Sequence, residues 1–93
     1  MQEARDSTEK RRFFLTFPER LIKQPILYTV STQFDVIPNI LGASISDRIG
    51  KVAIELDGQP DKLDAVIRYF LDLGVTVEDL GEADSIPNKL ADD

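Results

Sequence analysis

The chain has 93 residues and a formal net charge of −6, and it contains neither cysteine nor histidine. This length suits one domain with a modest core, in which a buried catalytic cavity would occupy much of the interior. The missing residue types remove the commonest metal ligands, the thiolates that hold iron–sulfur clusters and the usual general base near neutral pH. We therefore expect no metal, no cofactor and no enzymatic activity.

The distribution of charge and polarity sets the expected domain limits. Residues 78–93 carry six acidic side chains and one basic side chain, so they account for −5 of the net charge. The stretch 1–11 is polar without an apolar period. We expect a disordered tail over 1–11, one domain over 12–80 and a flexible acidic tail over 81–93.

The same features limit the partners and the location. An acidic chain argues against binding to a nucleic-acid backbone. No apolar run approaches the roughly 20 residues of a membrane span, and the polar first residues are unlike a secretion signal. The absence of cysteine fits a cytoplasmic protein.

The first expected strand covers residues 12–17. Its apolar residues Phe13, Leu15 and Phe17 alternate with Phe14 and Thr16, which is the period of a strand with one face toward a core. Phe14 then lies on the opposite face, where it either meets a partner or lies beneath a loop.

The expected first helix covers residues 25–34. It follows a connection over 19–24, and Pro25 suits the first helical position. The apolar residues that follow have helical spacing: Ile26, Leu27, Val30 and Phe34. Thr29, Ser31 and Thr32 are weak helix formers, so packing against the rest of the domain must hold this helix.

Two strands over 37–46 and 51–57, joined by a turn over 47–50, predict a hairpin. Pro38 suits an edge strand, because proline cannot donate a hydrogen bond to a neighbouring strand. Gly42 permits a bulge in the first strand of this hairpin.

The second helix is expected over residues 60–73, with Gly74 as its stop and a last strand over 75–80. Its apolar stripe consists of Leu63, Val66, Ile67, Phe70 and Leu71. The resulting order β-α-β-β-α-β predicts an α+β, ferredoxin-like two-layer sandwich: two helices on one face of a four-stranded antiparallel sheet of order 4-1-3-2.

A short set of motifs adds a family resemblance. Asn39-Ile40-Leu41 is followed by Ile49-Gly50, which opens a strand that closes on Asp57-Gly58. In order and spacing these motifs resemble the NIL domain, over roughly residues 12–80. That family is best known as the C-terminal regulatory module of methionine-importer ATPases, and it also occurs free-standing and beside ferredoxin-type iron–sulfur modules. The resemblance implies an ACT-like regulatory domain that binds a small amino acid, methionine first, near a homodimer interface.

The same motifs give five candidate ligand-binding residues: Asn39, Ile40, Leu41, Gly42 and Gly50. The resemblance implies that Asn39 holds the backbone end of the amino acid, although its amide would equally satisfy backbone groups of an edge strand. One of Ile40 and Leu41 faces outward, toward either a pocket or a second copy. Gly42 and Gly50 allow close approach of a ligand or a strand, or simply form a bulge and a turn.

No pattern of catalytic residues accompanies this candidate site. Asp57, Asp61 and Asp64 surround a helix start, where carboxylates are favoured without any catalytic role. The serines and threonines have no histidine to activate them. The alternative function is therefore a protein-interaction module without a ligand, which pairs with itself, with an iron–sulfur protein or with a transporter.

Overall fold

The structure is a computed structural model that describes residues 8–81. The expected tails over 1–11 and 81–93 lie outside the described residues, apart from residues 8–11 and Gly81. In chain order the elements are β1 (Glu9–Pro18), the 3₁₀ helix η2 (Glu19–Leu21), α1 (Ile26–Gln33), β2 (Ile37–Ile45), β3 (Ile49–Gly58), α2 (Pro60–Leu73) and β4 (Thr76–Gly81).

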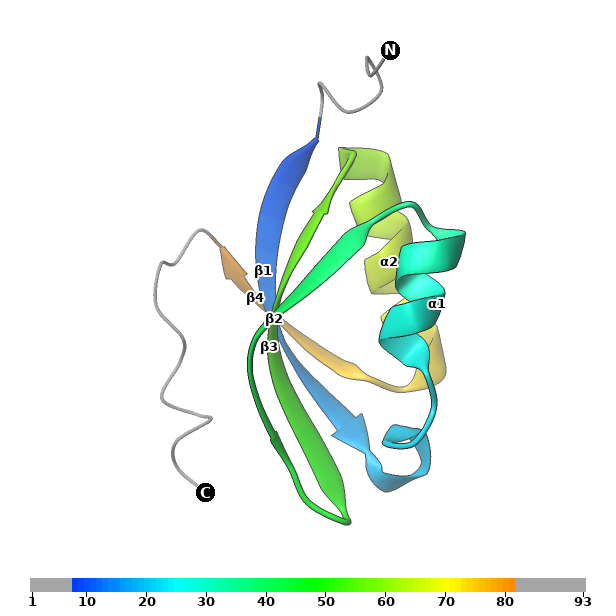
Figure 1. Ribbon diagram of the computed structural model, residues 1–93, viewed down its shortest axis with the longest axis vertical. Helices are drawn as coiled ribbons and strands as arrows, with labels where there is room; N and C mark the ends of the chain where they lie inside the picture. Colours follow the sequence, from blue (N-terminus) through cyan, green and yellow to red (C-terminus); the bar gives the residue numbers. More distant parts are fainter. Residues whose placement is uncertain (1–7, 82–93) are drawn as a thin grey trace.

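The four strands form one antiparallel sheet in the order β2-β3-β1-β4, which confirms the expected order 4-1-3-2 read from the other edge. Both helices lie on the same side of this sheet (Figure 1). The fold is therefore the expected two-layer α+β sandwich, with β2 at one edge and β4 at the other.

The core lies between the helices and the two central strands. β1 and β3 contribute alternating side chains that are almost fully buried: Phe13, Leu15, Phe17, Val52, Ile54 and Leu56. The helices cover them with Ile26, Val30, Leu63, Val66 and Phe70. Full burial of one such aliphatic or aromatic side chain contributes about 1.5–3 kcal/mol. The alternation in the strands and the stripe on α2 therefore supply the stability of the domain.

The C-terminal end of α2 is fixed by two features. Gly74 has a left-handed backbone (φ 102), as a helix C-terminal glycine often does. The Arg20 guanidinium donates a hydrogen bond to the Leu73 carbonyl at 2.7 Å. Because Arg20 belongs to η2, this bond joins the connection after β1 to the end of α2. A side chain on Gly74 would collide with the same guanidinium.

Two strands begin earlier than the sequence predicts. β1 starts at Glu9, where it pairs with Gly58, and the Arg11 guanidinium contacts both Glu9 and Asp64. β3 starts at Ile49 because Ser46 tightens the hairpin turn: its hydroxyl accepts hydrogen bonds from the backbone N–H groups of Arg48 and Ile49.

The connection between β1 and α1 also differs from the prediction. Residues 19–21 form η2 in a stretch that was expected to be irregular. Pro25 lies just before α1, at the N-cap position, so the helix begins at Ile26. This connection forms one wall of the cavity described next.

Candidate functional site

A cavity of about 250 Å³ lies between the start of α1 and the edge strand β2. Ligand pockets for drug-sized molecules occupy about 300–1,000 Å³, so this cavity suits a smaller molecule. Thirteen residues line it: Phe17, Leu21, Ile22, Gln24, Pro25, Ile26, Leu27, Tyr28, Ile40, Ala43, Ile45, Gly50 and Val52.

One wall comes from the connection after β1 and the first turn of α1. Leu21, only 2% exposed, anchors η2 in the core, while Arg20 holds its other side at the end of α2. The chain then passes Pro25 and enters α1, so that Gln24 to Tyr28 face the cavity. The wall is therefore held at η2 and at the helix start.

The opposite wall comes from β2, and a bulge decides which of its residues face the cavity. Directly opposite residues of an antiparallel pair share one face of the sheet. Ile40 pairs with the buried core residue Ile54, and Ile45 pairs with Gly50 on the same face. Strict alternation would place Ile40 and Ile45, five positions apart, on opposite faces. The register shift between Ile40 and Gly42 brings both to the helix side.

The cavity is apolar, with polar groups confined to a few positions. None of its thirteen lining residues carries a charge, and only Gln24 and Tyr28 bring polar side chains. The N-cap residue Pro25 makes no side-chain capping hydrogen bond. The Ile26 N–H donates to the Gln24 carbonyl at 2.8 Å, and the next N–H groups at the start of a helix have no acceptor within it. The cavity can thus accept an apolar side chain, while Gln24 and the helix start offer hydrogen bonds to a polar end.

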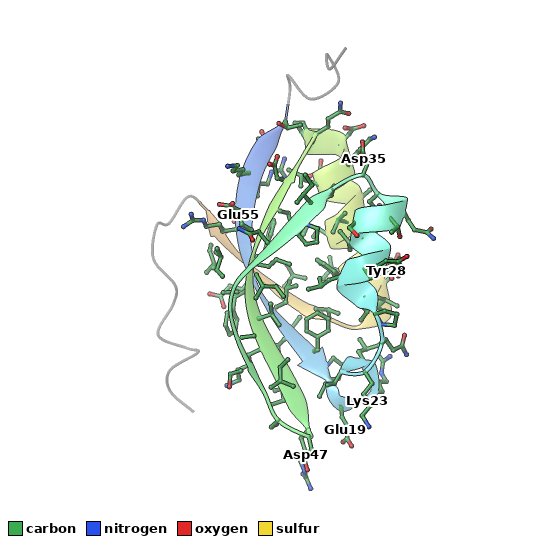
Figure 2. All side chains as sticks on the ribbon, in the orientation of Figure 1. Glu19, Lys23, Tyr28, Asp35, Asp47 and Glu55 are labelled. Atoms are coloured by element: carbon green, nitrogen blue, oxygen red, sulfur yellow. The ribbon has the colours of Figure 1, made fainter. Side chains whose placement is uncertain are left out.

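The strand beside the cavity is an open edge. Within residues 8–81, β2 pairs only with β3, and its isoleucines are largely exposed: Ile37 by 53%, Ile40 by 54% and Ile45 by 61%. Tyr28 on α1 is exposed by 69% (Figure 2). Unpaired backbone groups flanked by exposed aliphatic side chains form a template for another strand.

The structure brings together some of the predicted site residues and separates others. Ile40 and Gly50 both line the cavity. Asn39 is opposite Glu55, on the sheet face away from the helices, and Gly42 is opposite Ala53 on that same face. Leu41 is the extra residue of the bulge. The predicted run therefore divides between the two faces of β2.

Sequence reasoning missed the residues of the first wall. Leu21, Ile22 and Gln24 lie in a stretch without an apolar period, which offered no signal beyond the paired apolar residues Leu21-Ile22 before Pro25. Their role arises only because α1 crosses the sheet near β2.

Charged groups of the described residues lie away from the cavity. Arg11 pairs with Glu9 and Asp64, and the hydrogen bonds that its guanidinium donates, first to Asp64 and then to Glu9, raise its pKa. Within residues 8–81, no group of three or more acidic side chains is arranged to hold a metal ion. No helix in that range is long and apolar enough to span a bilayer.

These features define a class: a ferredoxin-like α+β domain with a small apolar cavity beside an unpaired sheet edge. Residues 11–79 match the model of the NIL domain, and the chain belongs to the NIL domain family. The family resemblance seen in the sequence motifs is thereby confirmed.

Two known proteins are similar to this chain. It is 27% identical over 78 residues to the methionine import ATP-binding protein MetN of Myxococcus xanthus (strain DK1622). That match covers 80% of the chain but 24% of MetN, so the chain spans about a quarter of the length of this relative. The crystal structure of the C-terminal domain of an ABC transporter ATP-binding protein from Enterococcus faecalis shares the fold, with a TM-score of 0.68 and 23% identity. The shared region covers 78% of this chain and 86% of that one.

Proposed function

We propose that this domain binds a small amino acid with an apolar side chain in the cavity beside β2, near a homodimer interface formed along that strand. Methionine is the first ligand to test, because the related MetN is named as a methionine import protein. The observation that carries the proposal is an uncharged cavity at an unpaired edge of a NIL domain. The proposed role is regulatory and cytoplasmic: the domain binds a ligand and catalyses no reaction.

The lining residues suggest how the ligand is oriented. Its side chain packs on Ile40 and Val52, with Gly50 leaving room between the strands. Its polar end lies at the Gln24 amide and the first turn of α1. A buried apolar group with a few polar contacts is the usual composition of a small-molecule site.

The remaining predicted residues, Leu41, Gly42 and Asn39, contribute to the proposed function at the β2 edge of the sheet. Leu41 and Gly42 form the bulge that turns Ile40 and Ile45 toward the cavity. Asn39 is exposed on the opposite face, so its amide reaches a second copy more readily than the cavity of its own chain.

Binding and association are linked through β2. Ile40 and Ile45 line the cavity and are also more than half exposed at the edge. A ligand that packs on them changes the surface that a second copy meets. By thermodynamic reciprocity, association then changes ligand affinity by the same factor.

Titration with L-methionine, followed by calorimetry and amide NMR, tests the ligand. We expect binding in the wild type, and a loss of at least tenfold in Gly50→Val, which is about 1.4 kcal/mol. A β carbon at Gly50 meets neighbours at 3.7 Å or more, so the valine fits the strand while occupying the cavity. Ser44→Val on the neighbouring strand β2, where Ser44 is opposite Lys51 on the sheet face away from the cavity, is the control. Binding that survives Gly50→Val but fails in Ser44→Val would place the ligand elsewhere.

Sedimentation velocity tests the dimer. Ile45→Lys on β2 places a charge on the proposed interface and is expected to weaken association at least tenfold, about 1.4 kcal/mol. Thr76→Lys, exposed on the other edge strand, should leave association unchanged. Equal effects of the two variants would exclude β2 as the interface.

The open edge also favours a second function, that of an interaction module without a ligand. The three exposed isoleucines of β2 serve strand pairing with or without an occupied cavity. Association that is lost in Ile45→Lys, in a protein that shows no shifts with L-methionine or with other apolar amino acids, would select this function. Its partner is then a second copy, a transporter or an iron–sulfur protein.

A further inference from the structure

The C-terminal end of α2 receives a cation from outside the helix. Its own last turn contains no basic residue. The N–H groups of the two residues that follow the helix donate to carbonyls within it, the usual arrangement at a helix that ends in glycine. The carbonyl of Leu73 accepts instead from the Arg20 guanidinium, at 2.7 Å and across 53 positions of sequence. A positive charge at this end also suits the helix dipole.

The sequence leaves room for this arginine at Gly74. A β carbon on Gly74 would collide with the Arg20 guanidinium, so a larger residue there would displace it. The left-handed backbone of Gly74 (φ 102) is a separate reason for glycine. Gly74 therefore serves both the turn after α2 and the close approach of Arg20.

The residues that follow Arg20 carry its position into the cavity wall. Leu21 is 2% exposed and lies in the core, and Ile22 beside it lines the cavity. The Cγ1 atom of Ile22 lies 3.7 Å from the point where a β carbon of Gly50 would stand, and the Cγ1 atom of Ile45 lies 3.8 Å from the same point. Ile22 therefore reaches from the connection to the two strands that border the cavity.

The 3₁₀ helix η2 has little structure of its own to hold this wall in place. It is a single turn of three residues whose N-cap makes no side-chain hydrogen bond, and such short helical pieces are unstable alone. Two backbone hydrogen bonds within residues 19–24, of 3.2 and 3.1 Å, make the turn move as one unit. Its position is therefore set by contacts outside it, namely the burial of Leu21 and the bond from Arg20 to Leu73.

We propose that Arg20 is a positioning residue for the cavity, because its bond to the Leu73 carbonyl fixes the wall formed by η2. The cavity and the end of α2 are then linked in both directions. A group that fills the cavity presses on Ile22 and loosens this bond, and loss of the bond releases the wall. The effect on an amino-acid ligand rests on the proposed function, whereas the effect on the wall does not.

NMR of the ligand-free chain separates a positioning role from simple capping of α2. Arg20→Met keeps the aliphatic stem and removes the donor, so it should shift the Ile22 methyl and weaken its nuclear Overhauser effect to the Gly50 α protons severalfold. Arg20→Lys, which retains a donor, should restore most of the effect. Lys23→Met, at an exposed cation of the same connection (Figure 2), is the control and should change neither signal. Shifts confined to residues 71–75 in Arg20→Met would overturn the proposal.

A double-mutant cycle tests the link from the other direction. Gly50→Val fills the cavity beside Ile22 and should shift the Gly74 amide in the wild-type background. In the Arg20→Met background the same substitution should shift this amide much less, because the connection to α2 is lost. Equal shifts in both backgrounds, or no shift in either, would overturn the proposed link.

Binding of L-methionine tests the consequence for the site. Arg20→Met should weaken it about fivefold, at the low end of the coupling between separate sites. Arg20→Lys should recover most of the loss, and Lys23→Met should bind as the wild type does. Absence of binding in the wild type would contradict the proposed amino-acid function but not the role of Arg20, which the ligand-free spectra decide. Unchanged affinity in Arg20→Met, with the wall displaced, would overturn the positioning role.

Discussion

The domain consists of two βαβ units, β1-α1-β2 and β3-α2-β4. They share one plan but differ in how firmly their helices and edge strands are fixed. In the second unit, α2 is 14 residues long and is followed by Gly74, whose backbone is left-handed. The carbonyl of its last residue, Leu73, accepts a hydrogen bond from Arg20. In the first unit, α1 has only 8 residues, and its C-cap residue Phe34 has a right-handed backbone. The cavity borders α1 and not α2. The candidate site therefore lies beside the less firmly held unit.

The edge strands show the same contrast. β4 exposes Thr76, Glu78 and Asp79, polar and charged residues that discourage pairing with another chain. β2 exposes three isoleucines instead. The two edges of one sheet therefore carry opposite chemistry, and this difference is the basis for proposing association along β2.

The largest expected effect tests whether the second unit holds the fold. Phe70→Ala on α2 removes a fully buried aromatic ring and should lower the free energy of unfolding by about 3–5 kcal/mol. Ile26→Ala on α1 borders existing empty space and should cost about 2 kcal/mol, at the low end for such truncations. Urea unfolding measures both values. Equal losses would remove the distinction between the two units.

A medium effect tests the helix ends. Gly74→Ala places a side chain at φ 102 and against Arg20, so it should cost about 1–2 kcal/mol. One residue beyond the C-cap of α1, Asp35 already has φ 59. Asp35→Gly should change stability by less than about 0.5 kcal/mol, because relief of strain and loss of chain entropy nearly cancel. Thermal and urea unfolding report both, and a neutral Gly74→Ala would argue that α2 is not fixed at this end.

The smallest effect concerns the ion pairs of Arg11, which join β1 to α2. Arg11→Met should cost about 0.2–1 kcal/mol, and the difference should shrink in high salt, since the Asp64 partner is largely exposed. The folded pKa of Arg11 is raised by Asp64 and Glu9. Its contribution is thus complete below the ordinary pKa and is lost only as the pH rises through the folded pKa. The mutant and wild type should therefore differ by the same amount at pH 7 and pH 9.

Much of the fold can be predicted from the sequence, because apolar residues recur with a clear strand or helix period. The alternation in β1 and β3 and the stripe on α2 predict the layers, the strand order and the outward position of Phe14. The early start of β3 did not follow, because the Ser46 hydroxyl tightens the turn through local hydrogen bonds that leave no apolar pattern.

The site follows from the sequence only in part, for a different reason. Ile40 and Gly50 carry the family motif and do lie at the cavity. Leu21 and Gln24, far from that motif in sequence, complete it because α1 crosses the sheet near β2. Such meetings depend on tertiary packing, and no local pattern encodes them.

The bulge in β2 has a consequence for how this site can diversify. Because one inserted residue reverses the facing of everything that follows it along the strand, insertions or deletions near Gly42 would exchange the lining of the cavity for side chains now on the far surface. Such a change would alter the shape and the chemistry of the cavity through the register of the strand, without the substitution of any side chain.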